Sequence, residues 1–593
     1  MCGIAGKVNF DGKPVTQAEI ATMCQAIKHR GPDDQGVWTK GPIGLGNRRL
    51  SIIDLSPAGN QPISNENKTV WITFNGEIYN FQELRAKLIK KGHRFHSKTD
   101  TETIVNLWEE YGVNCLKMLR GMFAFALWDQ NQKILFLARD RLGKKPLKYY
   151  LDDKVFIFAS ELKAILTQKV KTEPDYQAID HFFGMEAVPE PQTGFKQIKK
   201  LPAGSYLILK NGQATVKSYW QQNFSSKLKL SEAEWIETIK TKLTEAVKLR
   251  LISDVPVGAF LSGGIDSSTV VALMKQLGQE RINTFSVGFA GSPDELPYAR
   301  TVAKMFGTNH HEVVLKPNSW SLLTKLATAY EEPYGDPSAL PTFLVSKLAA
   351  KAMKVVLSGD GGDENFAGYQ RYQKFAFLNP IGRLLPFLNS GPTVYPTAYL
   401  GLTAPTGFKK SLYQPQFWDS IDALATKDLF QKQQRKNLKP LDNVLKTDFK
   451  LYLGQVLLPK MDSASMANSL EVRSPFLDQE LVELTAKIPD KFKLKGLTSK
   501  YILKQTVKDL LPQEIIHRPK MGFGFPLDKW LRHEWKNKVK NLLLDPTAKY
   551  RTFLKPQAVE TMILRPLTGE HYDRRLWRVI MFEYWLRHYF PKL

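Results

Sequence analysis

The feature that most limits the fold of this chain is a change of hydrophobic pattern at a polar stretch, QQNFSSKLKLS, at residues 221–231. Before it, short apolar runs typical of strands, such as TVWITFNGEIYN and KILFLARD, alternate with turns. After it, apolar strands alternate with helices, which is the pattern of a parallel α/β sheet. A chain of 593 residues is also too long for one hydrophobic core. The sequence therefore predicts two domains joined by one linker.

Each side of the linker has its own expected fold. Residues 2–215 are predicted as sheets with helices near residues 16–28 and 80–91. Residues 232–593 are predicted as α/β structure around a parallel sheet, and the chain becomes mostly helical from about residue 365. We therefore expect an α+β first domain, followed by an α/β domain with a helical carboxy-terminal region.

The net charge and its distribution indicate which partners the protein could bind. The net charge is +25, and such a charge can serve a polyanionic partner. The lysines are scattered, however, and form no long basic run with interleaved aromatic residues. We therefore do not expect nucleic acid as a partner. The positive charge is attributed either to a proteome whose soluble proteins are generally basic or to a site that binds ATP and acidic substrates.

The cysteines and the apolar stretches indicate the compartment. Three cysteines, at positions 2, 24 and 115, give neither a disulfide framework nor metal-type spacing, which suits a reducing cytoplasm. The first residues contain no apolar signal core. Four prolines interrupt the most lipid-like stretch, residues 375–402, whereas a membrane-spanning helix needs about 20 mostly apolar residues. We predict a cytoplasmic protein without a membrane partner, and a helical insertion at about 375–450.

The first candidate nucleophile is Cys2, directly behind the initiator methionine. Removal of Met1 would give one residue both a free α-amino group and a thiol. The thiolate is the reactive form of cysteine. An α-amino group has a pKa of about 7.7–8.0, so that a useful fraction is neutral at pH 7 and can accept the thiol proton. Cys2 is therefore predicted to be a self-contained nucleophile and base.

Acyl transfer by such a thiol also needs groups that hold the substrate. Asn75 and Gly76 follow a strand-like run, where the Asn75 amide and the Gly76 N–H could stabilise an oxyanion. A substrate with an amino-acid head needs a carboxylate ligand, which Arg49 could supply through a bidentate contact. It also needs an ammonium ligand, for which Glu77 and Asp100 are the candidates.

Seven segments taken together carry a resemblance to a known family. They are MCGIAG, HRGPDDQG, RRLSIIDLS, FNGEIYN, SKTDTE, GMFAFALWD and RDRLGKKPLKYY. Residues 2–205 resemble the glutaminase domain of class II, N-terminal-nucleophile, glutamine amidotransferases, which implies an αββα sandwich. By this resemblance Cys2 attacks the side-chain amide of glutamine and releases ammonia. The oxyanion hole would consist of Asn75 and Gly76, and glutamine would be held by Arg49, Glu77 and Asp100.

A second candidate site begins at AFLSGGIDSST, which is predicted as strand, loop and helix. Gly263 and Gly264 would let backbone N–H groups approach phosphate oxygens at the positive end of the helix. Hydroxyl donors would come from Ser262, Ser267 and Ser268. No G-x-x-x-x-G-K-[ST] motif occurs in the chain, which excludes a Walker-type nucleotide site. The end of a strand in a parallel sheet is where such sheets bind ligands.

A second acidic turn, VVLSGDGGDE, also follows an apolar strand. Asp266 in the first turn and Asp363 in the second could share a Mg²⁺ ion that bridges triphosphate oxygens. Each aspartate alone could equally cap a helix in a βα loop. The expected cofactors are ATP and Mg²⁺.

The two turns together resemble the ATP-pyrophosphatase domain of asparagine synthetases and related amidotransferases, over about residues 235–530. By this resemblance, four residues contact the adenosine part of ATP: Leu261, Val287, Ser358 and Gly359. Asp360 stands where the family carries an acidic residue tied to acyl-adenylate formation, and Lys500 matches its catalytic lysine. A lysine near the α-phosphate can neutralise charge as ammonia displaces AMP.

Together the two resemblances imply an ATP-dependent carbon–nitrogen ligase with glutamine as the nitrogen donor. The default acceptor is aspartate, which would give asparagine through β-aspartyl-AMP, and a homodimer would be compatible with the family. Asp360 in place of the usual glutamate, EEPYGDPSALPTF and RPKMGFGFP depart from the housekeeping pattern. These departures leave open another carboxylate, such as a cell-envelope sugar or a peptidoglycan precursor.

One hypothesis from another class also remains open. A basic protein could bind nucleic acid or an anionic membrane while its catalytic sites have decayed. The site residues are intact, which argues against decay; they include Cys2, Asn75, Asp100, Asp266 and Asp363.

Overall fold

The computed structural model describes residues 2–290, 295–376, 405–522, 524–564 and 570–593. The prolines of the predicted insertion at 375–402 lie outside the described residues. The described part of 405–450 is helical and comprises α14 (Thr406–Leu412), α15 (Pro415–Asp419), α16 (Ala425–Gln433) and α17 (Pro440–Thr447). Among the described residues, no helix has the length and apolarity that a bilayer crossing requires.

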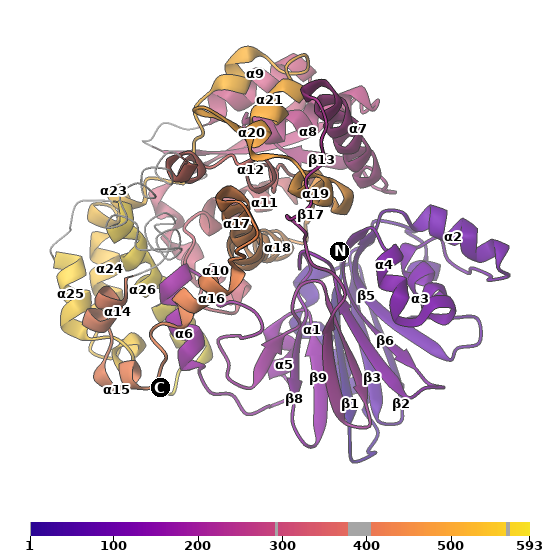
Figure 1. Ribbon diagram of the computed structural model, residues 1–593. Helices are drawn as coiled ribbons and strands as arrows, with labels where there is room; N and C mark the ends of the chain where they lie inside the picture. The colour runs from indigo at the N-terminus through magenta and orange to yellow at the C-terminus, as the bar shows by residue number, and fades with distance from the viewer. Residues whose placement is uncertain (1, 291–294, 377–404, 523, 565–569) are drawn as a thin grey trace.

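The amino-terminal half contains two six-stranded antiparallel sheets, at the lower right of Figure 1. The first has the order β10 (Ile198–Lys200), β8 (Lys148–Leu151), β9 (Val155–Ala159), β1 (Gly3–Asn9), β3 (Ile43–Arg49) and β2 (Asp34–Lys40). The second has the order β12 (Gln213–Ser218), β11 (Ser205–Lys210), β7 (Ile134–Arg139), β6 (Gly121–Asp129), β5 (Val70–Ile78) and β4 (Ile63–Ser64).

Strand alternation explains how these sheets form a sandwich. Along β6, Ala124 and Ala126 belong to the apolar layer between the sheets, whereas Phe123 and Phe125 belong to the layer under helix α3 (Asp100–Tyr111). Helix α1 (Gln17–Ala26) covers the outer face of the first sheet in the same way. Because helices bury both outer faces, the strands are apolar on both sides. The predicted αββα arrangement is confirmed.

The second half is built on a five-stranded parallel sheet, with the order β15 (Asn309–Leu315), β14 (Asn283–Phe289), β13 (Val257–Phe260), β16 (Val355–Leu357) and β17 (Glu471–Arg473). Helix α7 (Glu232–Arg250) opens this half, and Ser231 and Glu234 form a capping box at its start. Helix α8 (Ile265–Gln276) follows β13 directly. The predicted parallel α/β sheet is therefore present.

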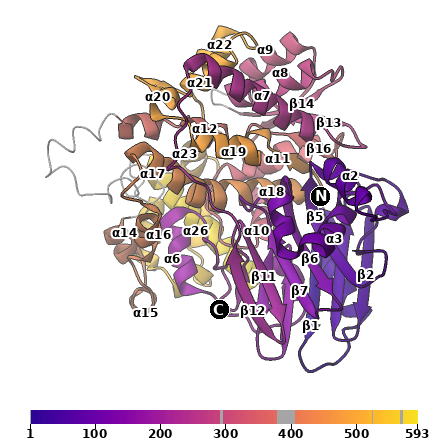
Figure 2. The ribbon, with the colours of Figure 1, turned by 45° about the vertical axis from the view of Figure 1, so that its right-hand side comes forward.

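Carboxy-terminal helices complete the molecule and contact both halves. The longest is α26 (Glu570–Tyr589), which packs on α10 (Leu323–Tyr330). Phe182 and Phe183 of α6 (Tyr176–Met185) contact Phe582 of α26, in a tilted and an edge-to-face ring arrangement respectively. In Figure 2, α6 and α26 overlap to the left of the strands of the β-sandwich. Apolar side chains of the two halves therefore pack against each other.

Candidate active sites

The thiol of the first site lies where the two antiparallel sheets meet. Cys2 precedes β1, is 7% exposed, and its main-chain nitrogen donates to Asn75 Oδ1 over 3.1 Å. Strands β1 and β5 belong to different sheets and contact each other, which brings these two residues together. Removal of Met1 would make this nitrogen the α-amino group. The predicted nucleophile therefore lies beside the predicted oxyanion residue.

The Asn75 side chain has the form that an oxyanion hole needs. Its Oδ1 is occupied by Cys2, while its Nδ2 is buried without a hydrogen-bond partner among the described residues. A buried amide donor without a partner costs about 1–3 kcal/mol, and a negatively charged oxygen would satisfy it. The geometry thus supports the predicted role of this side chain.

Gly76 is required by the close approach of β5 and β6. A Cβ atom on it would lie 2.1 Å from Met122 O, a distance that no side chain can adopt. On the same strand, Phe74 N donates to Gln61 Oε1 over 2.7 Å, and Ile78 N donates to Asp100 Oδ2 over 2.7 Å. Alternate N–H groups of a strand point the same way, so the Gly76 N–H lies between these two, on the site side of β5.

Two buried carboxylates lie beside this strand. Glu77 is 5% exposed, and its Oε2 accepts no hydrogen bond from any described residue. Asp100 begins α3 and is also 5% exposed. Burial raises the pKa of Glu77 well above its usual value and raises the pKa of Asp100 to about 6. A cationic ligand would favour the charged form of both groups.

Arg49 lies near the thiol, but its guanidinium already has partners. It donates to Ser56 O over 3.2 Å, to Asn60 Oδ1 over 2.6 Å, to Ile53 O over 3.2 Å, and to Asp54 O. A bidentate contact with a substrate carboxylate would therefore require loop 53–60 to release it. Burial raises the pKa of the Cys2 thiol, while the Leu50 N–H and the Arg49 charge oppose this rise.

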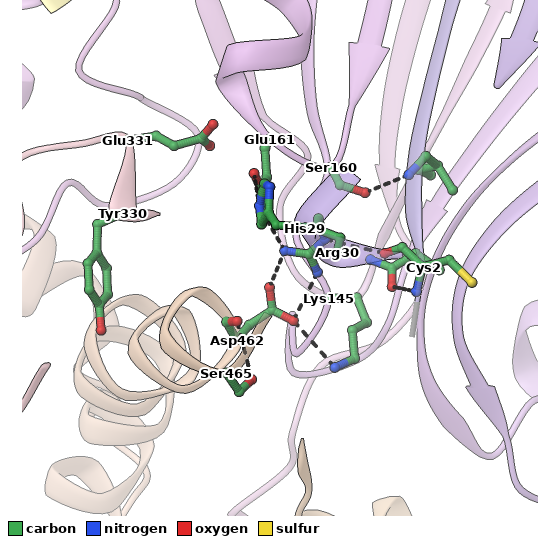
Figure 3. A network of polar contacts seen from close by, with 12 residues as sticks. Cys2, His29, Arg30, Lys145, Ser160, Glu161, Tyr330, Glu331, Asp462 and Ser465 are labelled. Atoms are coloured by element: carbon green, nitrogen blue, oxygen red, sulfur yellow. Dashed lines mark hydrogen bonds and ion pairs between the residues drawn. The ribbon is translucent and has the colours of Figure 1, made fainter. Parts of the chain in front are cut away.

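A charged network missed by sequence reasoning supports the Cys2 backbone (Figure 3). Arg30 is 1% exposed and donates to Cys2 O over 3.3 Å. Its Nη1 lies 2.8 Å from Glu161 Oε1 and 2.9 Å from Asp462 Oδ2, and Lys145 Nζ lies 3.4 Å from Asp462 Oδ1. Asp462 belongs to α18 (Leu458–Met466) in the second half. Arg30 lies in HRGPDDQG and Asp462 lies more than 400 residues further along the chain, so no local signal pairs them.

The second site is a cavity of about 260 Å³ at the carboxyl ends of β13, β14 and β16. Most of the residues predicted from the sequence line it. They are Leu261, Ser262, Gly264, Asp266, Ser267, Val287, Ser358, Gly359, Asp360, Asp363 and Lys500. The structure thus brings together turns that lie far apart in the sequence.

Two predicted residues do not line this cavity. Ser268 is fully buried, because it lies one residue beyond Ser267 on α8 and faces the core instead of the loop. Gly263 has φ +67°, and a Cβ atom on it would lie 2.4 Å from the main-chain carbon of Tyr298. Its role is therefore to let the loop turn beneath helix α9 (Leu296–Phe306). The predicted contacts of both residues with ATP remain predictions.

A lysine lies between the two aspartates that were expected to share a metal ion. Lys500 Nζ is 2.5 Å from Asp266 Oδ2 and 2.7 Å from Asp363 Oδ1, and Lys520 pairs with Asp363 Oδ2. Although burial opposes it, these two lysines hold the pKa of Asp363 below its usual value, whereas burial raises the pKa of Asp266. Sequence reasoning identified Lys500 through its family and missed Lys520.

The donor set is compatible with Mg²⁺ bound together with a nucleotide. Asp266 Oδ1 is buried and accepts no hydrogen bond within the part of the chain that the structure describes. That part contains no group of three or more His, Cys, Asp or Glu side chains that could hold a metal by itself. Mg²⁺ commonly takes one or two carboxylates and completes its shell with water and phosphate oxygens, and two aspartates match that requirement.

Asp360 follows Ser358 and Gly359, which are predicted to contact the adenosine part of ATP. Ser358 Oγ donates to Asp360 Oδ2 over 2.8 Å, and burial raises the pKa of this carboxyl. Tyr369 and Glu364 also line the cavity; Tyr369 Oη donates to Glu364 Oε1 over 2.6 Å, and burial raises the pKa of Glu364 to about 7. Arg518 and Glu295 form a further ion pair on the lining. Sequence reasoning did not single out these last four residues.

Comparison with known proteins supports this pair of sites. The family model "Asparagine synthase" matches residues 238–587, and the model "Glutamine amidotransferase domain" matches residues 1–220. The chain is 34% identical to asparagine synthetase [glutamine-hydrolyzing] 1 of Bacillus subtilis, over 99% of this chain and 96% of that protein.

Two further relatives extend the comparison. A putative asparagine synthetase [glutamine-hydrolyzing] 2 of Methanocaldococcus jannaschii is 41% identical over 65% of this chain and 79% of that protein. The amidase chyE of Penicillium rubens is 30% identical over 96% of this chain and 95% of that protein. The chain therefore belongs to the asparagine synthase family and is a glutamine-dependent ligase of that family.

Proposed function

We propose that the enzyme transfers the amide nitrogen of glutamine to the side-chain carboxylate of aspartate, consuming ATP and releasing AMP and pyrophosphate. The observation that carries the proposal is the pairing of Cys2 with Asn75, in which Oδ1 is occupied and Nδ2 is left without a partner among the described residues. The names of the two asparagine synthetase relatives support aspartate as the acceptor.

The first step is glutamine hydrolysis. The α-amino group of processed Cys2 takes the thiol proton, and the sulfur attacks the side-chain carbonyl carbon of glutamine. Asn75 Nδ2 and the Gly76 N–H stabilise the oxyanion, while Glu77 and Asp100 bind the substrate ammonium. The proton then passes to the departing ammonia, and water hydrolyses the thioester to glutamate.

The second step is adenylation of the acceptor. The acceptor carboxylate attacks the α-phosphorus of ATP, pyrophosphate leaves, and ammonia then displaces AMP to form the amide. Lys500 and Lys520 neutralise charge on the phosphate oxygens, and Asp266 and Asp363 would hold Mg²⁺, which supplies further charge neutralisation when bound. The loop around Ser262 and Gly264 donates to the phosphates at the start of α8.

A second acceptor class has specific support. A relative that matches nearly the full chain is named an amidase, and Asp360 replaces the longer glutamate expected in its position. The shorter side chain leaves more room at the wall of the cavity. A larger carboxylate, such as a cell-envelope sugar acid, is therefore the alternative acceptor.

An assay of pyrophosphate release with glutamine, ATP and a panel of carboxylic acids tests the proposal. We expect activity with aspartate and production of asparagine. Activity with a uronic acid or a diaminopimelate-containing precursor, but not with aspartate, would favour the alternative. Cys2→Ala should abolish the glutamine-dependent reaction and leave the ammonia-dependent reaction, and loss of both would contradict the assigned division of labour.

A further inference from the structure

The second half of the chain supplies a buried arginine to the glutamine site. Arg473 ends β17 of the parallel sheet and has no exposed surface. Its Nη2 lies 3.4 Å from Glu77 Oε1, on β5 of the antiparallel sheet. This contact joins residues that are nearly 400 positions apart in the sequence, and it crosses between the two halves of the enzyme.

The rest of the Arg473 guanidinium is fixed by groups of the second half. Its Nε donates to Glu471 Oε1 over 2.5 Å, and its Nη1 donates to Arg250 O over 2.8 Å and to Ile252 O over 2.7 Å. A planar guanidinium held at three points has little rotational freedom. The remaining nitrogen is therefore directed at Glu77 by the packing of β17 and the end of α7.

The Arg473 charge favours the ionised form of Glu77, against the burial that raises the pKa of this carboxyl well above its usual value. Glu77 lies in a buried position near two other carboxylates, Glu471 and Asp100, and both disfavour its ionised form. Arg473 is the described side chain whose charge opposes them. Burial of a carboxylate without a positive partner would favour its neutral form, and a neutral group binds an ammonium weakly.

We propose that Arg473 is a positioning residue of the glutamine site, which orients Glu77 by one carboxylate oxygen and leaves the other oxygen for the ammonium group of glutamine. The inference rests on the proposed role of Glu77 as an ammonium ligand. Glu77 Oε2, which accepts no hydrogen bond from the described residues, is the oxygen left available. The glutamine site is then complete only when β17 of the second half is in place.

The test is steady-state kinetics of the full-length enzyme carrying Arg473→Gln. We expect the KM for glutamine to rise about tenfold or more, while ammonia-dependent pyrophosphate release stays within about twofold of the unsubstituted enzyme. A merely structural role of Arg473 would lower both activities together. An unchanged KM for glutamine would overturn the proposal.

Arg120→Gln is the matched control. Arg120 also joins the halves, through contacts of 2.8–3.2 Å with the buried Asp478, but it has no contact with Glu77. Its substitution should leave the KM for glutamine unchanged. A rise equal to that of Arg473→Gln would assign the effect to the general interface and overturn the specific role.

A double-mutant cycle with Glu77→Gln separates this inference from the proposed function. If Glu77→Gln raises the KM and Arg473→Gln adds nothing to it, the two residues act as a unit. Additive effects would overturn the role of Arg473 and leave that of Glu77 intact. An unchanged KM in Glu77→Gln would refute the proposed ammonium ligand and, with it, the basis for Arg473.

If the Arg473→Gln variant folds poorly, Arg473→Lys is a second variant that tests the same role. Lysine retains the charge but cannot reach Glu77 and the three other acceptors at once. We expect a smaller rise in the KM for glutamine, with full ammonia-dependent activity. A KM equal to that of the unsubstituted enzyme would show that the fork geometry does not matter and would overturn the positioning role.

Discussion

Single side chains in the first site have hydrogen-bonding capacity left for a substrate. Asn75 Oδ1 accepts a hydrogen bond from Cys2, and Asn75 Nδ2 has no partner among the described residues. Glu77 Oε1 pairs with Arg473, and Glu77 Oε2 accepts no hydrogen bond from the described residues. Buried polar atoms usually have a partner. Two buried polar atoms without hydrogen-bond partners in one site destabilise the folded protein unless a ligand forms hydrogen bonds with them.

Removal of the Asn75 amide should lower the turnover number for glutamine. Asn75→Ala deletes one oxyanion donor, a change that typically lowers kcat by about 10²–10³-fold. The release of glutamate measures this step, and ammonia-dependent amidation serves as the internal control because it does not use the first site. Equal loss of both activities would contradict the assignment of Asn75.

Glutamine binding should weaken in mild acid. Burial raises the pKa of Asp100 from 3.8 to about 6, so that the carboxylate is ionised at pH 7.5 and becomes protonated as the pH falls through 6. A protonated group no longer attracts the substrate ammonium, and we expect the KM for glutamine to rise between pH 7 and pH 5. A KM that stays flat over this range would contradict the prediction.

At the scale of elements, each site is built at a strand end. Strand β5 carries Asn75, Gly76 and Glu77 in succession. Strand β17 carries Arg473 beside Glu77 and is followed by Ser474, whose Oγ lies 3.0 Å from Ser358 Oγ on the lining of the second cavity. Alternation along a strand sends neighbouring side chains to opposite faces. One short strand can therefore contribute to both sites.

The turn between β13 and α8 should not tolerate a side chain at Gly263. Gly263→Ala would combine a strained φ of +67° with a Cβ atom 2.4 Å from the backbone of Tyr298. We expect ATP-dependent pyrophosphate release to fall more than about tenfold, since the strain of about 1–2 kcal/mol is joined by a steric collision. Glutamate release from glutamine should persist.

Gly278→Ala controls for the conformational strain alone. Gly278 has φ +87°, yet a Cβ atom there would meet nothing within 4 Å. This variant should keep both activities and lose only about 1 kcal/mol of stability in denaturant unfolding. Loss of pyrophosphate release in both variants would show that strain, and not the close approach of Tyr298, limits the loop.

At the scale of the whole molecule, buried charges hold the two halves together. Asp462 of α18 pairs with Arg30 and Lys145, whose side chains are 1% and 3% exposed. Helix α18 also packs on α10 and α11 (Ala339–Ala349), so that the network links the Cys2 backbone to the core of the second half. Movement of α18 would therefore be transmitted to the nucleophile through Arg30.

Breaking this network should be far more costly than breaking an exposed pair. Asp462→Asn leaves Arg30 and Lys145 without their shared charge and should lower the free energy of unfolding by about 3–5 kcal/mol. Asp33→Asn removes an ion pair of 2.6 Å with Lys354, with side chains 28% and 40% exposed, and should cost at most about 1 kcal/mol. Denaturant unfolding measures both, and equal losses would contradict the argument.

The sequence determined the parts of this protein that depend on local chemistry. Apolar alternation predicted the two sheet systems, the glycines of SGGIDSS predicted a loop whose backbone N–H groups can approach a ligand, and Cys2 with FNGEIYN predicted the first site. Each of these runs and motifs, taken by itself, is about a dozen residues or fewer in length, and the periodicity of strands and helices fixes the spacing of its side chains.

Only the tertiary structure decided which distant charges meet. The pairs Arg30 with Asp462, Lys145 with Asp462 and Glu77 with Arg473 join segments separated by more than 300 residues. No local pattern selects one lysine or arginine among 83 for such a pair. The selection comes from burial, because a charge excluded from water is stable only beside the partner that the packing of both halves delivers to it.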